Sequence, residues 1–212
     1  MFKRILITVA FTLSFTSVHA VGPEVHLLQE KWAEIKYRSA KDAQAEKFES
    51  LMKLAETYVR QAPRDAEILI WYGIIESSYA GAKGGLVALG HAKNAKKTFE
   101  NAIEVNPTAL DGSAFTSLGS LYYQVPGWPI GFGDDKKALE FLRKGLSINS
   151  DGIDSNFFYG DFLLRSGDLV GAEAALRKAL KAPSRLGRAT ADEGRRTEIE
   201  HLLQKLSEKR RG

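Results

Sequence analysis

One spacing of small and large apolar residues occurs three times in this chain, and it constrains the fold more than any other feature. Each occurrence opens with a glycine after an aromatic residue or leucine: Gly73, Gly119 and Gly160. A second set then follows at spacings of four, three and five: Ala95, Phe99, Ala102 and Pro107; Ala138, Leu142, Gly145 and Ser150; Ala172, Leu176, Ala179 and Ser184. Small residues let two helices cross closely, and large ones fill the groove between them. The pattern predicts three helical hairpins.

This register resembles the tetratricopeptide repeat (TPR), a helix-turn-helix unit of about 34 residues. The second unit departs from the family pattern, because Gly145 stands where the family usually has alanine. From about residue 24 onward apolar residues recur at helical spacing, and no alternating strand pattern appears. The resemblance therefore implies an all-α, TPR-like solenoid of about three repeats with flanking capping helices.

The expected boundaries follow from the matched positions. Two regions flank the repeats: N-terminal helices in residues 24–65 and a C-terminal capping helix in residues 189–209. A solenoid needs such caps because each terminal unit would otherwise expose its apolar face. The predicted repeats span residues 66–107, 112–150 and 153–184.

The first two units are longer than the third. Gly73 and Ala95 are 22 residues apart and Gly119 and Ala138 are 19 apart, whereas Gly160 and Ala172 are only 12 apart. The extra residues fall between the two helices of a unit, so we expect two enlarged connections on the same edge of the solenoid. For the first connection, "SSYAGAKGGLVALGH", a flexible loop and a helix extension are both open.

The second connection, "VPGWPIGFGDD", ends in a helix start. Asp134 and Asp168 each lie four residues before the alanine of a second helix, where a carboxylate caps the backbone N–H groups, and His91 holds the equivalent place in the first unit. By the same reasoning Asp151 would cap the third unit. Thr190 and Glu193 would form a capping box at the last helix.

The first twenty residues read as an export signal. Lys3 and Arg4 precede a short apolar run that ends with small residues at Ala20, the predicted cleavage site. A buried N-terminal helix and a retained membrane anchor are the alternatives. The expected location is the bacterial periplasm, with no membrane association after cleavage.

The residues offer little for catalysis or metal binding. The chain has no cysteine, and His26, His91 and His201 lack metal-ligand spacing. No phosphate-binding loop or nucleophile motif is present, and lysine and arginine cluster only in the tail "EKRRG". We therefore expect no cofactor, no metal, no nucleic-acid partner and no enzymatic activity.

The TPR resemblance implies that the first helix of each unit lines a concave groove. The candidate groove residues are Ile74, Ser120, Tyr123, Phe157, Asp161 and Arg165. The loop adds the aromatic candidates Trp128 and Phe132. For Trp128 two interpretations are open: a strut packed against its own repeat, or part of a binding surface.

The preferred hypothesis is an exported, non-enzymatic scaffold that binds a protein or peptide through the groove and the two enlarged connections. The alternative is a small-molecule binder with a pocket under those connections. The loop "GWPIGFGDDKKA" is also similar to that of periplasmic TPR proteins associated with TRAP-type solute transporters, although no cysteine is present for a lipid anchor. That similarity implies a transporter's substrate-binding protein as partner.

Overall fold

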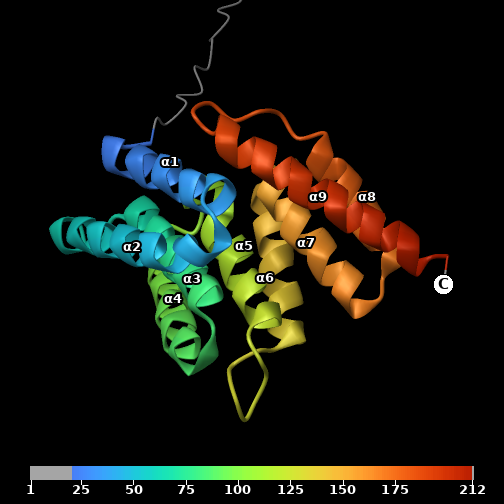
Figure 1. The fold of residues 1–212 in the computed structure, drawn as a ribbon, viewed down its shortest axis with the longest axis horizontal. Coiled ribbons are helices and arrows are strands. Elements are labelled where there is room, and N and C mark those ends of the chain that lie inside the picture. Colours follow the sequence, from blue (N-terminus) through green and yellow to red (C-terminus); the bar gives the residue numbers. More distant parts are fainter. Residues whose placement is uncertain (1–20, 212) are drawn as a thin grey trace, which may run out of the picture.

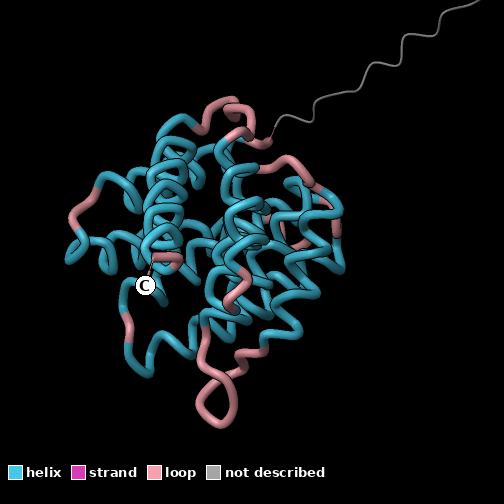
Figure 2. The backbone as a smooth tube through the Cα atoms, turned by 90° about the vertical axis from the view of Figure 1, so that its right-hand side faces the viewer, coloured by secondary structure: helices cyan, strands magenta, loops and turns pink. Residues whose placement is uncertain are grey.

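The structure, a computed structural model, describes residues 21–211, and the predicted signal peptide lies outside the described residues. The described chain is all-α and contains no strand; Gly127 and Gly133 form one isolated bridge (Figures 1 and 2). Residues 21–211 form nine helices: α1 Pro23–Arg38, α2 Gln44–Gln61, α3 Ala66–Lys83, α4 Gly85–Val105, α5 Ala109–Gln124, α6 Asp135–Ile148, α7 Ile153–Ser166, α8 Leu169–Leu180 and α9 Ala189–Lys209. A short 3₁₀ turn, Lys41–Ala43, joins α1 to α2.

Three helical hairpins, α3–α4, α5–α6 and α7–α8, form the body and stack in series (Figure 1). In each hairpin the glycine of the first helix lies against the large apolar residue of the second. A Cβ atom added to Gly73 would lie 2.7 Å from the Phe99 ring, and one added to Gly119 or Gly160 would lie 2.8 Å from Leu142 or Leu176. Real Cβ atoms do not approach so closely, so glycine is required at all three positions. The predicted TPR-like solenoid is confirmed.

The alanines of the repeat are fully buried between the helices. Ala95, Ala138 and Ala172 have no exposed surface. The glycine that departs from the family pattern has a local cause, because a Cβ atom on Gly145 would collide with the Thr116 hydroxyl group of α5. The departure therefore accommodates a polar side chain in the α5–α6 contact.

The helix starts follow the predicted capping in two of the five cases. The Asp134 carboxylate accepts hydrogen bonds from the backbone of Lys136 and Lys137, and Asp168 accepts one from Gly171. The other three predictions are wrong. His91 lies inside α4, whose cap is Gly84; α7 begins after Gly152 without a side-chain cap, while Asp151 pairs with Lys178 at 3.1 Å; and Thr190 lies inside α9, after its cap Arg188.

The two enlarged connections have different structures. Between α3 and α4 the inserted residues extend both helices, which are separated only by Gly84 at φ 65°. Alanine, leucine and lysine favour helix, and a positive φ at glycine permits the sharp turn. Between α5 and α6 the prolines prevent such an extension, and residues 125–134 form a protruding loop (Figure 2).

The first and last helices meet. Helix α9 packs on α8 and α7 and also reaches α1 (Figure 1). At this seam Tyr37 donates a hydrogen bond to Glu198 at 3.2 Å, and Arg38 pairs with Glu193 at 3.3 Å. The solenoid therefore closes on itself along one side. None of the helices in residues 21–211 has the length and hydropathy needed to cross a bilayer.

Candidate functional site

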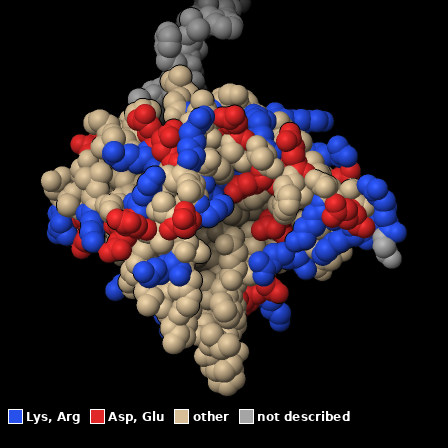
Figure 3. All heavy atoms as spheres, viewed as in Figure 1, with Lys and Arg blue, Asp and Glu red and all other residues tan. Residues whose placement is uncertain are grey.

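The two connections meet at one end of the molecule and form a surface that we call the tip, defined by Leu86, Val87, Trp128 and Ile130. These apolar side chains are exposed to 88%, 56%, 90% and 65%, respectively. The connections are neighbours, because a Cβ atom on Gly131 would lie 3.2 Å from the Leu89 side chain. In Figure 3 the lowermost projection shows no charged side chain.

The tip loop is held from within by backbone and aromatic contacts. Gly133 donates a hydrogen bond to the Pro126 carbonyl oxygen at 2.9 Å, and Asp134 donates one to Tyr122 at 2.9 Å. The Phe132 ring packs edge-on against Tyr122, with centroids 5.6 Å apart. Phe132 therefore anchors the loop to α5, whereas Trp128 points outward. The strut interpretation of Trp128 is wrong, since 90% of this residue is exposed.

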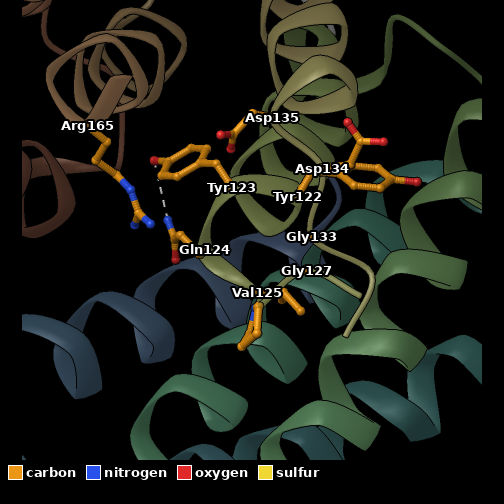
Figure 4. Close-up of a pocket in the computed structure, with 10 residues that line it drawn as sticks. Tyr122, Tyr123, Gln124, Val125, Gly127, Gly133, Asp134, Asp135 and Arg165 are labelled. Atoms are coloured by element: carbon orange, nitrogen blue, oxygen red, sulfur yellow. Dashed lines mark hydrogen bonds between the residues drawn. The ribbon is translucent and has the colours of Figure 1, made fainter. Parts of the chain in front are cut away.

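A pocket of about 470 Å³ lies beneath this loop and contains the predicted residues Tyr123 and Arg165. The Tyr123 hydroxyl group donates to Asp161 at 2.8 Å, and the Arg165 guanidinium lies 5.1 Å from the centre of the tyrosine ring. Figure 4 shows Arg165 reaching toward Tyr123 from a neighbouring helix. Burial and then the charge of Asp161 raise the pKa of Tyr123, so its phenol stays protonated and acts as a donor.

The concave groove has a volume of about 840 Å³. Four of the predicted residues line it: Ile74 from α3, Ser120 from α5, and Phe157 and Asp161 from α7. Residues of α1, α9 and the linker 181–188 also line this groove, which the sequence did not predict. The groove is thus lined by the first helices of the repeats together with the helices that meet at the seam.

A network of charges lies in the groove. Asp154 binds Arg185 at 2.6 Å and Arg195 at 2.8 Å, and Arg185 also binds Asp192 at 2.6 Å. Burial alone would raise the pKa of Asp154, but the positive charges of Arg185, Arg195 and Arg188 outweigh it and hold that pKa well below its usual value. Asp154 is therefore ionised, and it ties α7 to both the linker and α9.

These surfaces combine exposed apolar side chains, a pocket with a tyrosine and an arginine, and a network of ion pairs. No group of three or more His, Asp or Glu side chains in residues 21–211 is placed to hold a metal ion. Sequence reasoning missed the three arginines of the groove, because Arg185 and Arg188 lie in a segment, "APSRLGR", that reads only as a helix breaker. It also missed Leu86, Val87 and Ile130 at the tip. A usable signal was present for the first two, because the adjacent glycines Gly84 and Gly85 directly precede this apolar pair.

Comparison with known proteins supports the repeat assignment. The tetratricopeptide repeat family profile matches residues 86–108. No curated protein sequence matches this chain. The thermophilic TPR protein TTC0263 of Thermus thermophilus is similar in structure, with a TM-score of 0.54 and 18% identity over 81% of this chain and 96% of that one.

A second solved structure, MamA 41-end from Desulfovibrio magneticus RS-1, gives a TM-score of 0.45 at 17% identity, over 91% of this chain and 98% of that one. At such identities structural similarity shows the fold alone. The repeat match and the three stacked hairpins together support a TPR protein, and residues 21–211 fold as a TPR-like all-α solenoid.

Proposed function

We propose that this protein is an exported, non-enzymatic scaffold that binds a partner protein through the tip. TPR folds generally serve as protein-interaction scaffolds. The single observation that carries the proposal is the apolar tip, where Trp128 is 90% exposed beside three further exposed aliphatic side chains. Large apolar residues that gather on a surface mark binding sites, whereas isolated ones need no explanation.

The tip suits a protein partner with an apolar recess. Exposed tryptophans are frequent anchors of protein interfaces, because one side chain supplies a large contact area. The Trp128 loop is fixed by the Phe132–Tyr122 contact and by its backbone hydrogen bonds, so little conformational entropy is lost when it binds. The groove then offers a second contact surface for an extended segment of the same partner.

The proposed location is the periplasm, after cleavage following Ala20. N-terminal sequencing of the protein recovered from the producing cell tests this directly. A mature chain that begins at Val21 is the expected result, and a chain that still starts at Met1 would contradict it.

The function is tested by crosslinking pull-downs with three versions of the chain. The wild type and Val170→Ser, which changes an exposed apolar residue on α8 outside the tip, should capture the same stoichiometric partner. Trp128→Ser should lose that partner while its helical circular dichroism is unchanged. Retention of the partner by Trp128→Ser would contradict the proposal. Cosedimentation with phosphatidylcholine vesicles that depends on Trp128 would contradict a protein partner.

The pocket beneath the loop favours one second candidate function, the binding of a small molecule near Tyr123 and Arg165. A link to a TRAP-type solute transporter belongs to this candidate function. Native mass spectrometry of the purified protein separates the two functions: a bound small molecule lost in Arg165→Met would favour the pocket. Its absence, with a partner protein retained by the wild type, would favour the scaffold.

A further inference from the structure

Arg188, just before α9, is a cation without a partner in the groove. Its guanidinium lies over the Trp71 ring, 5.0 Å from the ring centre. The Arg188 side chain forms no ion pair with any residue in 21–211, and its buried Nε atom has no hydrogen-bond acceptor. Trp71 is 3% exposed, and its buried Nε1 donor also lacks an acceptor. Two unsatisfied donors therefore lie together in the wall of one groove.

The nearby carboxylates are occupied by other cations. Asp192 accepts from both the backbone and the side chain of Arg185, at 2.8 and 2.7 Å. Asp154 is shared by Arg185 and Arg195, and Glu198 binds Arg195 at 2.6 Å and Lys36 at 3.6 Å. The three carboxylates thus face four cations, and Arg188 is the cation left over.

The linker that carries Arg188 is fixed in place. Besides the Arg185–Asp192 contacts, Arg196 donates to the carbonyl oxygens of Leu180 and, at 2.8 Å, of Ala182. Burial and the like charge of Arg185 lower the pKa of Arg188 to about 10, so the guanidinium remains charged at neutral pH. Buried donors without acceptors are costly, and a site that keeps them gains when a ligand supplies the acceptor.

The rest of the groove is suited to an apolar body. Aromatic and aliphatic side chains share its walls with serine hydroxyl groups and charged side chains, and the apolar members include Trp32, Phe48, Trp71, Ile74, Phe157 and Phe158. Its volume of about 840 Å³ lies within the range of roughly 300 to 1,000 Å³ typical of small-molecule sites. Carboxylates bind Arg185 and Arg195 but not Arg188, so the Arg188 guanidinium is available to pair with one negative charge on a ligand.

We propose that the groove binds a small monoanionic organic acid, whose carboxylate accepts hydrogen bonds from Arg188 and whose apolar body lies against Trp71 and the neighbouring aromatic rings. A carboxylate suits the forked donors of a guanidinium. A ligand that draws Arg188 off the Trp71 ring also opens the indole N–H to the groove. This site is separate from the tip, so the proposal does not depend on the partner protein.

The test titrates the full mature chain with 3-phenylpropionate, indole-3-acetate and octanoate, each beside its neutral amide, by isothermal calorimetry. Tryptophan fluorescence is followed for 3-phenylpropionate and octanoate, which do not contain indole. At least one acid should bind, with an affinity about tenfold or more above that of its amide. Binding should change the emission, because Arg188 leaves Trp71. Arg188→Met should weaken binding by about tenfold or more, while Arg64→Met, at an exposed arginine outside the groove, should not change it.

Three results would overturn the proposal: no binding by any of the three acids, equal binding by acid and amide, or unchanged affinity in Arg188→Met. Competition with inorganic phosphate tests whether the groove binds any anion. Phosphate that displaces the acid at equal concentration would show a general anion site, in which the apolar walls have no role, and would also overturn the proposal. The acid and amide comparison in the wild type decides the question even if Arg188→Met fails to fold.

Discussion

Glycine has opposite roles in the body and in the α3–α4 connection. In the body a Cβ atom on any of three glycines would lie within 3.0 Å of a neighbouring side chain; these residues are Gly73, Gly119 and Gly160. In and beside the connection between α3 and α4 a Cβ atom would meet nothing within 4 Å; these residues are Gly81, Gly84, Gly85 and Gly90. The first set permits helices to approach, and within the second set Gly84 and Gly85 permit the chain to turn. The comparison shows that the spacing of a glycine relative to large residues, not its presence, indicates packing.

The largest effect is expected in the body. Gly119→Val places two methyl groups where even one Cβ atom would touch Leu142, so α5 and α6 must separate. Overpacking of this kind lowers the free energy of unfolding by about 3 kcal/mol. Urea denaturation followed by circular dichroism measures the change. A loss below about 1 kcal/mol would show that the hairpin contact is loose and would remove the distinction between body and tip.

The next largest effect is expected in the charge network of the groove, which belongs to neither the hairpin contacts of the body nor the tip. Asp154→Asn removes the charge that pairs with both Arg185 and Arg195. We expect a loss of about 2 kcal/mol, less than for a fully buried pair, because the Asp154 side chain is 33% exposed. Thermal melting of Asp154→Asn beside Asp151→Asn, whose aspartate is exposed, measures it. Equal melting temperatures would contradict a stabilising role for this charge network.

The same carboxylate gives the stability a pH dependence. The folded pKa of Asp154 is held below its ordinary value of about 3.9, so the unfolded chain takes up the proton first as the pH falls. The stabilisation is complete above about pH 4 and is lost as the pH falls toward the folded pKa. Urea midpoints measured from pH 7 to pH 3 should decline more steeply in the wild type than in Asp154→Asn. Parallel profiles would contradict this.

A smaller effect of opposite sign is expected near the tip. Gly90 lies inside α4 with open space around its Cα atom. Gly90→Ala should therefore raise the free energy of unfolding by about 0.8 kcal/mol, the difference in helix propensity. The same urea experiment used for Gly119→Val detects it. Destabilisation by Gly90→Ala would show that this glycine has a packing role after all.

The smallest effect on stability is expected at the tip itself. Trp128 is 90% exposed and therefore packs little against the rest of the chain. Trp128→Ser should change the free energy of unfolding by less than about 0.5 kcal/mol. The same substitution should abolish partner capture. A clear loss of stability would instead make Trp128 a structural residue and weaken its assignment to a partner surface.

The repeat body could be predicted from the sequence because its signal is local. The spacing of Gly73, Phe99 and their equivalents reports contacts within one hairpin, and those contacts are present. The acidic caps Asp134 and Asp168 are also local and were predicted. The predicted cap at Asp151 is wrong because Lys178, on another helix, binds the Asp151 carboxylate.

The groove could be predicted only in part, because one wall comes from residues far apart in sequence. Tyr37 and Glu198 meet across 161 positions, and Arg188 reaches Trp71 from the other end of the solenoid. These contacts depend on the summed rotation from one hairpin to the next, which no single repeat encodes. The tip was predicted as two neighbouring enlarged connections, but the helix extension in the first depended on its helix-forming residues outweighing its four glycines.

The contact between α1 and α9 limits which duplications and insertions the protein can accept as its sequence evolves. An open array gains binding surface by duplicating a unit at either terminus, because nothing opposes growth there. In this chain an added unit would separate Tyr37 from Glu198 and expose the groove. An insertion between the two helices of a unit adds surface without separating α1 from α9, and both insertions in this chain lie at such positions.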